Sequence, residues 1–192
     1  MIEVEAKIEV RDLQPLRRRL MELGAKLVSQ ETQHDIYLTH PQRNFTATDE
    51  ALRIRWTSSG EKYLTYKGAK LPSRIKTRKE LNLQVGDVEV AVEIFRQLGF
   101  QEAAMLDKRR EVWDLLGFKV CLDEVEGLGS FIEVEAAEGG SVPSNEERVL
   151  HITRQLGLGD LPLIRESYLE LIQRRRGGYR CGGANSNCID LR

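Results

Sequence analysis

Short segments in which apolar and polar residues alternate recur along the chain. The first of them, residues 2–10, has an apolar side chain at every even position and a charged one at every odd position. Because successive side chains of a strand point to opposite faces, this pattern predicts a β-strand with one charged face. Similar alternation predicts seven more strands, within residues 33–38, 52–56, 62–67, 77–83, 108–112, 118–123 and 131–135.

Four other segments have the signals of helices. Asp12 and Asp87 can each cap a helix that ends at a Leu-Gly pair, residues 23–24 and 98–99. Two more helices are expected over residues 143–156 and 167–176. About eight strands and four helices predict an α+β protein with a mainly antiparallel sheet.

The first part of the chain resembles the second after a shift of 75 residues. Asp12 then falls on Asp87, and the Leu-Gly pair at 23–24 falls on the pair at 98–99. Each half therefore consists of a strand, a capped helix, Leu-Gly and a second strand. This repeat favours two similar halves that close one sheet, although a chance match of a common motif is the alternative.

The charged strand faces allow two interpretations. In the first, they form the solvated face of an open antiparallel sheet whose apolar face rests on helices. In the second, they line the inside of a closed barrel, and the apolar faces pack outward on the helices. The charges are sorted by strand, with Glu3 and Glu5 on one strand and Arg53 and Arg55 on another, and this sorting favours the barrel. About eight strands can close around one small ligand.

A closed barrel would bring opposite charges into one lumen. Carboxylates of the first and last predicted strands would repel one another unless cations neutralised them, and hard oxygen ligands favour Mg²⁺ or Mn²⁺ over Zn²⁺. The basic side chains of the facing strands would need an anion, and guanidinium groups match phosphate oxygens. Metal ions held opposite phosphate are the parts required for phosphoryl or nucleotidyl transfer.

An ordered set of motifs resembles the CYTH superfamily, the triphosphate tunnel metalloenzymes. Glu3-x-Glu5-x-Lys7 matches the ExExK signature of that family. The other motifs follow in the family's order: Leu52-Arg53-Ile54-Arg55, Thr65-Tyr66-Lys67-Gly68, Arg78-x-Glu80, Lys108-x-Arg110, Asp123 and residues 128–135. The resemblance covers residues 1–172. The segment 173–192 lies outside it, and we expect a disordered, basic and glycine-rich tail there.

The subgroup with the greatest resemblance is the class IV adenylyl cyclases, which have an Asp-x-Tyr motif like Asp35-x-Tyr37 and a similar terminal helix. The resemblance implies an eight-stranded closed antiparallel β-barrel surrounded by helices. The metal ligands that it implies, for two Mg²⁺ or Mn²⁺ ions, are Glu3, Glu5, Asp123, Glu133 and Glu135. The catalytic, triphosphate-holding residues that it implies are Arg53, Arg55, Lys67, Lys108 and Arg110. Lys7, Arg78 and Glu80 would bind substrate in the same lumen.

The resemblance favours a metal-dependent adenylyl cyclase that converts ATP to cyclic AMP and pyrophosphate. A triphosphatase that uses the same site, for example on inorganic or thiamine triphosphate, stays open because a fold does not fix a function. A third possibility is a non-catalytic domain that binds phosphoanions. The intact pairs of carboxylates disfavour this third possibility.

Composition narrows the partners and the compartment. The formal net charge of −1 argues against a dedicated nucleic-acid binder. No apolar stretch approaches the roughly 18 residues of a transmembrane helix. The N-terminus has no signal-peptide pattern, and three cysteines without one favour a reduced, cytoplasmic protein. We therefore expect a triphosphate ligand and no nucleic-acid or membrane partner, and we leave a homodimer open.

Overall fold

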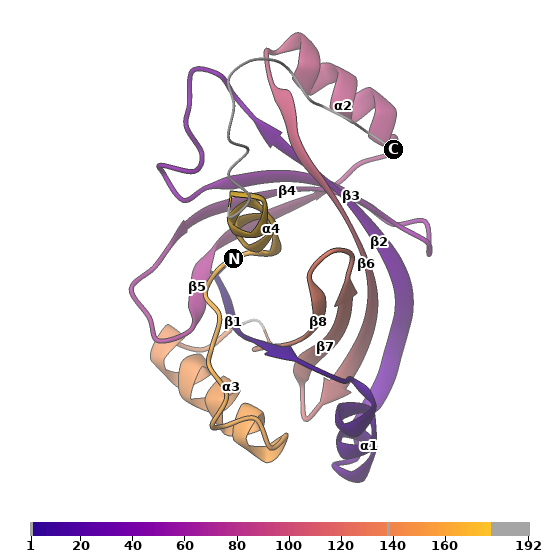
Figure 1. Cartoon of the computed structure of the whole chain (residues 1–192), viewed down its shortest axis with the longest axis vertical. Coiled ribbons are helices and arrows are strands. Elements are labelled where there is room, and N and C mark those ends of the chain that lie inside the picture. Colours follow the sequence, from indigo (N-terminus) through magenta and orange to yellow (C-terminus); the bar gives the residue numbers. More distant parts are fainter. Residues whose placement is uncertain (1, 138, 178–192) are drawn as a thin grey trace.

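Eight strands close into one barrel in the computed structural model, which describes residues 2–137 and 139–177 (Figure 1). The strands are β1 (Ile2–Val10), β2 (Lys26–Thr39), β3 (Ala51–Thr57), β4 (Lys62–Lys70), β5 (Lys76–Gln84), β6 (Gln101–Leu115), β7 (Phe118–Val125) and β8 (Gly129–Glu135). The helices are α1 (Gln14–Glu22), α2 (Val88–Gln97), α3 (Val142–Gln155) and α4 (Tyr168–Gly177). The order around the barrel is β1-β5-β4-β3-β2-β6-β7-β8, and every neighbouring pair is antiparallel. The predicted closed barrel is confirmed, and an open sheet is excluded.

The alternation in β1 decides which side chains enter the barrel. Glu5 and Lys7 point into the lumen, whereas Val4 and Ile8 point outward into an apolar cluster. All four are at most 3% exposed, so both faces of this strand are buried. Burial on both faces distinguishes a barrel covered by helices from a sheet with one wet face.

The helices cover the outward apolar faces. Leu20 of α1 and Val149 of α3 pack in a cluster with outward residues of β1, β6, β7 and β8. Val92 of α2 packs in a second cluster, over Ile54 and its neighbours on β2, β3 and β4. These clusters supply the hydrophobic stabilisation that a barrel with a charged interior cannot obtain from its lumen.

Helix α4 closes one end of the barrel. Tyr168 and Leu171 pack against Phe131, Leu106 and other buried residues at the ends of the strands. In Figure 1, α4 lies within the outline of the ring of strands. Its start is defined by a capping box with Ser167, and this places Tyr168 in the first turn.

The internal repeat is present in the topology. One half runs β1-α1-β2-β3-β4 and the other runs β5-α2-β6-β7-β8. Exchanging the two halves leaves the strand order of the barrel unchanged, and β1 pairs with β5 as β2 pairs with β6. The repeat read from the sequence is therefore not a chance match.

Several element bounds differ from the sequence prediction. β2 and β6 are far longer than the predicted segments 33–38 and 108–112, because two register shifts in their pairing interrupt the alternation. Asp12 does not occupy the cap position of α1, although its carboxylate accepts from the Gln14 amide at 2.9 Å. Asp87 caps α2 as predicted. α4 ends at Gly177, one residue beyond the predicted helix, so residues 173–177 of the segment expected to be a tail are helical. The rest of that segment lies outside the described residues.

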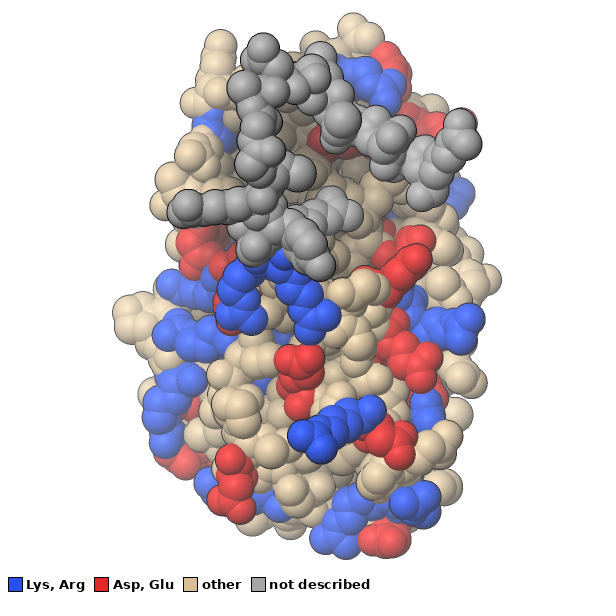
Figure 2. Space-filling view, viewed as in Figure 1, with Lys and Arg blue, Asp and Glu red and all other residues tan. Residues whose placement is uncertain are grey.

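The outer surface carries both signs of charge. Figure 2 shows basic and acidic side chains interspersed on one face of the molecule. His34 is partly exposed, and its ring lies 2.8 Å from the Asp107 carboxylate. None of the helices in the described part of the chain is long and apolar enough to span a membrane.

The packing of α1 gives a stability prediction. Leu20 is fully buried, whereas its neighbour Met21 is 58% exposed. We expect Leu20→Ala to lower the free energy of unfolding by about 2–5 kcal/mol through lost burial and a new cavity. We expect Met21→Ala, the control on the same helix, to change it by at most about 0.5 kcal/mol. Denaturant unfolding measures both, and equal losses would contradict the assignment of the buried face.

Candidate active site

A polar cavity of about 260 Å³ occupies the inside of the barrel. Its walls carry nine basic side chains and five acidic ones. Twelve of the thirteen predicted site residues line it: Glu3, Glu5, Lys7, Arg53, Arg55, Lys67, Arg78, Glu80, Lys108, Arg110, Glu133 and Glu135. The basic excess suits an anion with several charges.

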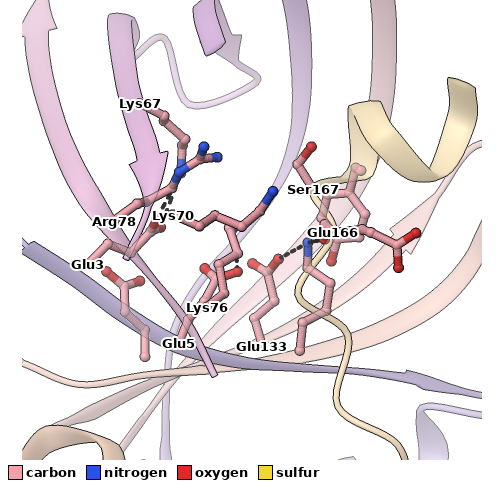
Figure 3. Close-up of polar contacts among 12 residues, drawn as sticks. Glu3, Glu5, Lys67, Lys70, Lys76, Arg78, Glu133, Glu166 and Ser167 are labelled. Carbon is pink, nitrogen blue, oxygen red and sulfur yellow. Dashed lines mark hydrogen bonds and ion pairs between the residues drawn. The ribbon is translucent and has the colours of Figure 1, made fainter. Parts of the chain in front are cut away.

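Carboxylates gather on β1 and β8, and lysines contact them (Figure 3). Glu5 lies directly opposite Glu135 in the pairing of these two strands. The Nζ atom of Lys67 lies 3.1 Å from Glu3 Oε1, and that of Lys76 lies 2.6 Å from Glu5 Oε1. Both lysines come from the strands β4 and β5 that follow β1 around the barrel. Glu3 and Glu5 are therefore each neutralised by a lysine from one of these two strands.

The two carboxylates of β8 differ in their surroundings. Glu133 lies 3.2 Å from Lys7 Nζ and 2.5 Å from an Arg110 nitrogen. Burial opposes its ionisation, but these cations outweigh burial and hold the pKa of its carboxyl well below the ordinary value. Burial raises the pKa of Glu135, and the negative charge of Glu3 raises it further. The Lys119 Nζ atom, 2.6 Å from a Glu135 carboxylate oxygen, lowers this pKa but does not reverse the shift. Negative charge is thus crowded at this end of β8.

The arginines of β3 lie on the wall that includes β2. Arg55 donates to both oxygens of Asp35, at 2.6 and 2.7 Å, and Arg53 lies 3.6 Å from the same carboxylate. Burial disfavours the Asp35 charge, but the two arginines hold the pKa of its carboxyl below the ordinary value. Arg53 also donates to Thr65 at 3.2 Å, while its Nε has no hydrogen-bond acceptor among the described residues. Arg53 therefore retains an unused donor in the barrel.

Asp123 is the one predicted site residue that does not line the cavity. It faces the interior of the barrel, as its strand partner Arg110 does, but it is fully buried beneath side chains that line the cavity. Its carboxylate accepts from Arg110 Nε at 2.7 Å, Lys108 Nζ at 3.2 Å and the Tyr168 hydroxyl at 2.8 Å. Burial and the neighbouring Arg110 lower the pKa of Lys108 to about 7, against the attraction of Asp123. Through these contacts Asp123 fixes the orientation of Lys108 and Arg110, the two basic side chains of β6 that face the cavity.

The donor set is compatible with a hard divalent cation. Glu3, Glu5, Glu133 and Glu135 offer only carboxylate oxygens, the ligands that Mg²⁺ and Mn²⁺ prefer. Across residues 2–137 and 139–177, no three His, Cys, Asp or Glu side chains converge closely enough to hold a metal ion in the present arrangement. Lysines contact these carboxylates instead, so a metal ion would have to replace lysine contacts.

Some cavity residues were missed by the sequence analysis. Lys76 lies two positions before Arg78 and points into the same lumen, so extending the alternation by one step would have found it. Lys119 faces the cavity next to Glu135 on the neighbouring strand. Tyr168 lies in the predicted helix 167–176, and no pattern in the sequence links it to the lumen.

A closed eight-stranded barrel with a charged lumen is the triphosphate tunnel fold. The family model described as the CYTH domain matches residues 1–168 of this chain. The chain belongs to the CYTH family, as the ordered motifs had indicated.

Relatives and solved structures agree with this assignment. The chain is 38% identical over 173 residues to a Methanocaldococcus jannaschii protein named "Putative adenylate cyclase MJ0240", covering 89% of this chain and 98% of the relative. It is 26% identical over 176 residues to "Adenylate cyclase CyaB" of Aeromonas hydrophila, covering 90% of this chain and 89% of the relative. The structure of the PH1819 protein from Pyrococcus horikoshii is 38% identical with a TM-score of 0.81, covering 91% of this chain and 99% of that one.

The pairing of Glu80 gives a prediction about pH. Glu80 contacts Lys67, and this cation, with Arg53 nearby, lowers the pKa of its carboxyl to about 2 despite burial. An unfolded chain has a glutamate pKa of about 4.3, so the ionised carboxylate stabilises the fold above pH 4.3. This stabilisation is lost as the pH falls towards 2.

Glu80→Gln should therefore lower the free energy of unfolding by up to about 3 kcal/mol at pH 7, and the difference from the unsubstituted protein should shrink towards zero near pH 2. Unfolding followed from pH 7 to 2 in the absence of phosphate measures this. Glu124→Gln is the control, because Glu124 is exposed on β7. A difference that does not depend on pH would contradict the electrostatic origin.

Proposed function

We propose that this protein is a metal-dependent adenylyl cyclase that converts ATP to cyclic AMP and pyrophosphate. The observation that carries the proposal is the cavity inside the barrel, in which nine basic side chains meet five carboxylates. The names of the two curated relatives support a cyclase. Proteins of this family bind triphosphates, which would occupy a cavity with a basic excess.

The charges are arranged so that phosphate and metal would lie on different walls. β1 stands opposite β2 in the barrel, and β3 and β6 flank β2. Arg53, Arg55 and Lys108 would therefore hold phosphate oxygens across the lumen from the carboxylates of β1. Glu3, Glu5, Glu133 and Glu135 would hold Mg²⁺ or Mn²⁺, which would supply Lewis-acid stabilisation of the phosphate charge. Asp123 would keep Arg110 and Lys108 directed to the substrate.

The proposed reaction is an intramolecular displacement. The ribose 3′-oxygen of ATP attacks the α-phosphorus, the bond to the bridging oxygen of the β-phosphate breaks, and pyrophosphate leaves with the electron pair. The 3′-hydroxyl proton must go to a base, and no histidine lines the described cavity. We therefore expect turnover to increase towards alkaline pH, where the acceptor would be hydroxide or a lysine of lowered pKa, such as Lys108 with a pKa of about 7.

A triphosphatase is the second candidate. A Hippeastrum protein with the same fold, 18% identical with a TM-score of 0.63, is described as a putative adenylyl cyclase with a dominant triphosphatase activity. The groups that line the cavity of this chain are mostly charged groups suited to phosphate. Water attacking the terminal phosphorus would use the same groups. A non-catalytic phosphoanion-binding domain is the third candidate.

The reaction products distinguish these candidates. With ATP and Mg²⁺ or Mn²⁺, we expect cyclic AMP and pyrophosphate in equal amounts, resolved by chromatography. Inorganic and thiamine triphosphate are assayed in parallel. Orthophosphate and ADP without cyclic AMP would reject the cyclase in favour of the triphosphatase. Binding of triphosphates without any turnover would leave only the non-catalytic domain.

The unused donor of Arg53 leads to a binding prediction. Arg53→Ala should weaken binding of inorganic triphosphate about 10- to 100-fold, since a charge-assisted hydrogen bond contributes about 1.5–3 kcal/mol. The control is Arg109→Ala, because Arg109 lies on β6 between two lumen residues but is itself exposed. Calorimetric titration measures both. Equal affinities in the two variants would remove Arg53 from the phosphate site.

A further inference from the structure

Tyr168, the first residue of α4, presents a hydroxyl to the charged network behind the cavity. The side chain is 5% exposed, and its ring packs edge-on against Phe131 with the centroids 5.1 Å apart. An apolar side chain could fill this space. The hydroxyl, however, donates to Asp123 at 2.8 Å, so the residue links the apolar end of the barrel to its charged interior.

The ring of Tyr168 also contacts two ammonium groups. The Nζ atom of Lys7 lies 3.9 Å from the ring centroid, and that of Lys108 lies 4.9 Å from it. Two like charges close to one another repel, and the electron-rich face of an aromatic ring attracts cations. Both lysines are nearly inaccessible to water, and each also contacts one carboxylate, Glu133 for Lys7 and Asp123 for Lys108, both at 3.2 Å. The ring is therefore placed to hold both ammonium groups at the wall of the cavity.

The segment around Tyr168 has further contacts that anchor it on the barrel. Lys70 of β4 pairs with Glu170 at 2.8 Å, and the Ile164 amide donates to the Lys7 carbonyl at 2.8 Å. Lys7 Nζ in turn donates to the Glu166 carbonyl at 3.1 Å. These anchors fix the position of α4 on the barrel, and α4 in turn determines where the ring of Tyr168 lies.

We propose that Tyr168 is a positioning residue for triphosphate binding. Its ring directs Lys7 and Lys108 into the cavity, and its hydroxyl holds Asp123, which in turn holds Arg110. Helix α4 is then part of the phosphate site and more than a cover for one end of the barrel. The inference rests on the proposed triphosphate-binding function of the cavity.

Two substitutions at this position separate the contribution of the aromatic ring to binding from that of apolar packing. Tyr168→Phe keeps the aromatic face and loses the hydroxyl, whereas Tyr168→Leu fills the apolar space without an aromatic face. We expect the Leu variant to bind inorganic triphosphate with Mg²⁺ at least about tenfold more weakly than the unsubstituted chain, and the Phe variant within about threefold of it. Leu171→Ala, in the same buried cluster, is the packing control and should lower the melting temperature while leaving affinity within about twofold.

Calorimetric titration of the full-length chain gives outcomes that separate the two claims. No binding of triphosphate by the unsubstituted protein would reject the proposed function, and the positioning role with it. Normal binding by the unsubstituted and Leu variants alike would reject only the positioning role. Equal losses in the Phe and Leu variants would overturn the role of the ring, because the loss of the hydroxyl alone would then account for both. Should Tyr168→Leu fail to fold, Tyr168→Met takes its place in the same comparison.

Discussion

Charged side chains inside a closed barrel must neutralise one another, because they have lost most of their hydration. This requirement explains how the lumen is organised. Lysines contact the carboxylates of Glu3 and Glu5, and Asp35 takes the guanidinium of Arg55 with two hydrogen bonds. The apolar faces of the same strands point outward, where α1, α2 and α3 supply the burial that offsets the cost of the charged interior. The barrel is stable with this interior only because both conditions are met together.

The charges inside the barrel do not neutralise one another completely, and the proposed function follows from the excess of basic side chains. Basic side chains outnumber acidic ones on the walls, the pKa of Lys108 is lowered to about 7, and Arg53 keeps an unused donor. An anion with several charges would satisfy these groups. Phosphate oxygens would also draw lysines away from the carboxylates, which a divalent cation could then occupy. Metal and triphosphate would therefore replace internal ion pairs rather than fill a neutral cavity.

The alternating pattern was sufficient for strands with one charged face, and the resemblance to the CYTH family selected the closed barrel and most of its lining. Successive side chains of a barrel strand point alternately into the lumen and to the apolar outer face, so the sequence of the strand has a period of two. β1 shows this period without interruption. The bounds of β2 and β6 were not predictable, because register shifts break the period without changing composition. The contact between Tyr168 and Asp123 joins segments that lie 45 residues apart in the sequence and meet only in the fold. No local sequence pattern predicts a contact between such distant segments.

The measurement that tests the central claim most directly is a crystal structure with inorganic triphosphate and Mn²⁺, in which anomalous scattering locates the metal. The account predicts triphosphate within the barrel against Arg53 and Arg55. It also predicts Mn²⁺ on the carboxylates of β1 and β8, with Lys67 and Lys76 turned from Glu3 and Glu5 towards phosphate. Triphosphate on the outer surface, or Mn²⁺ peaks away from these carboxylates while the internal ion pairs stay intact, would contradict the account.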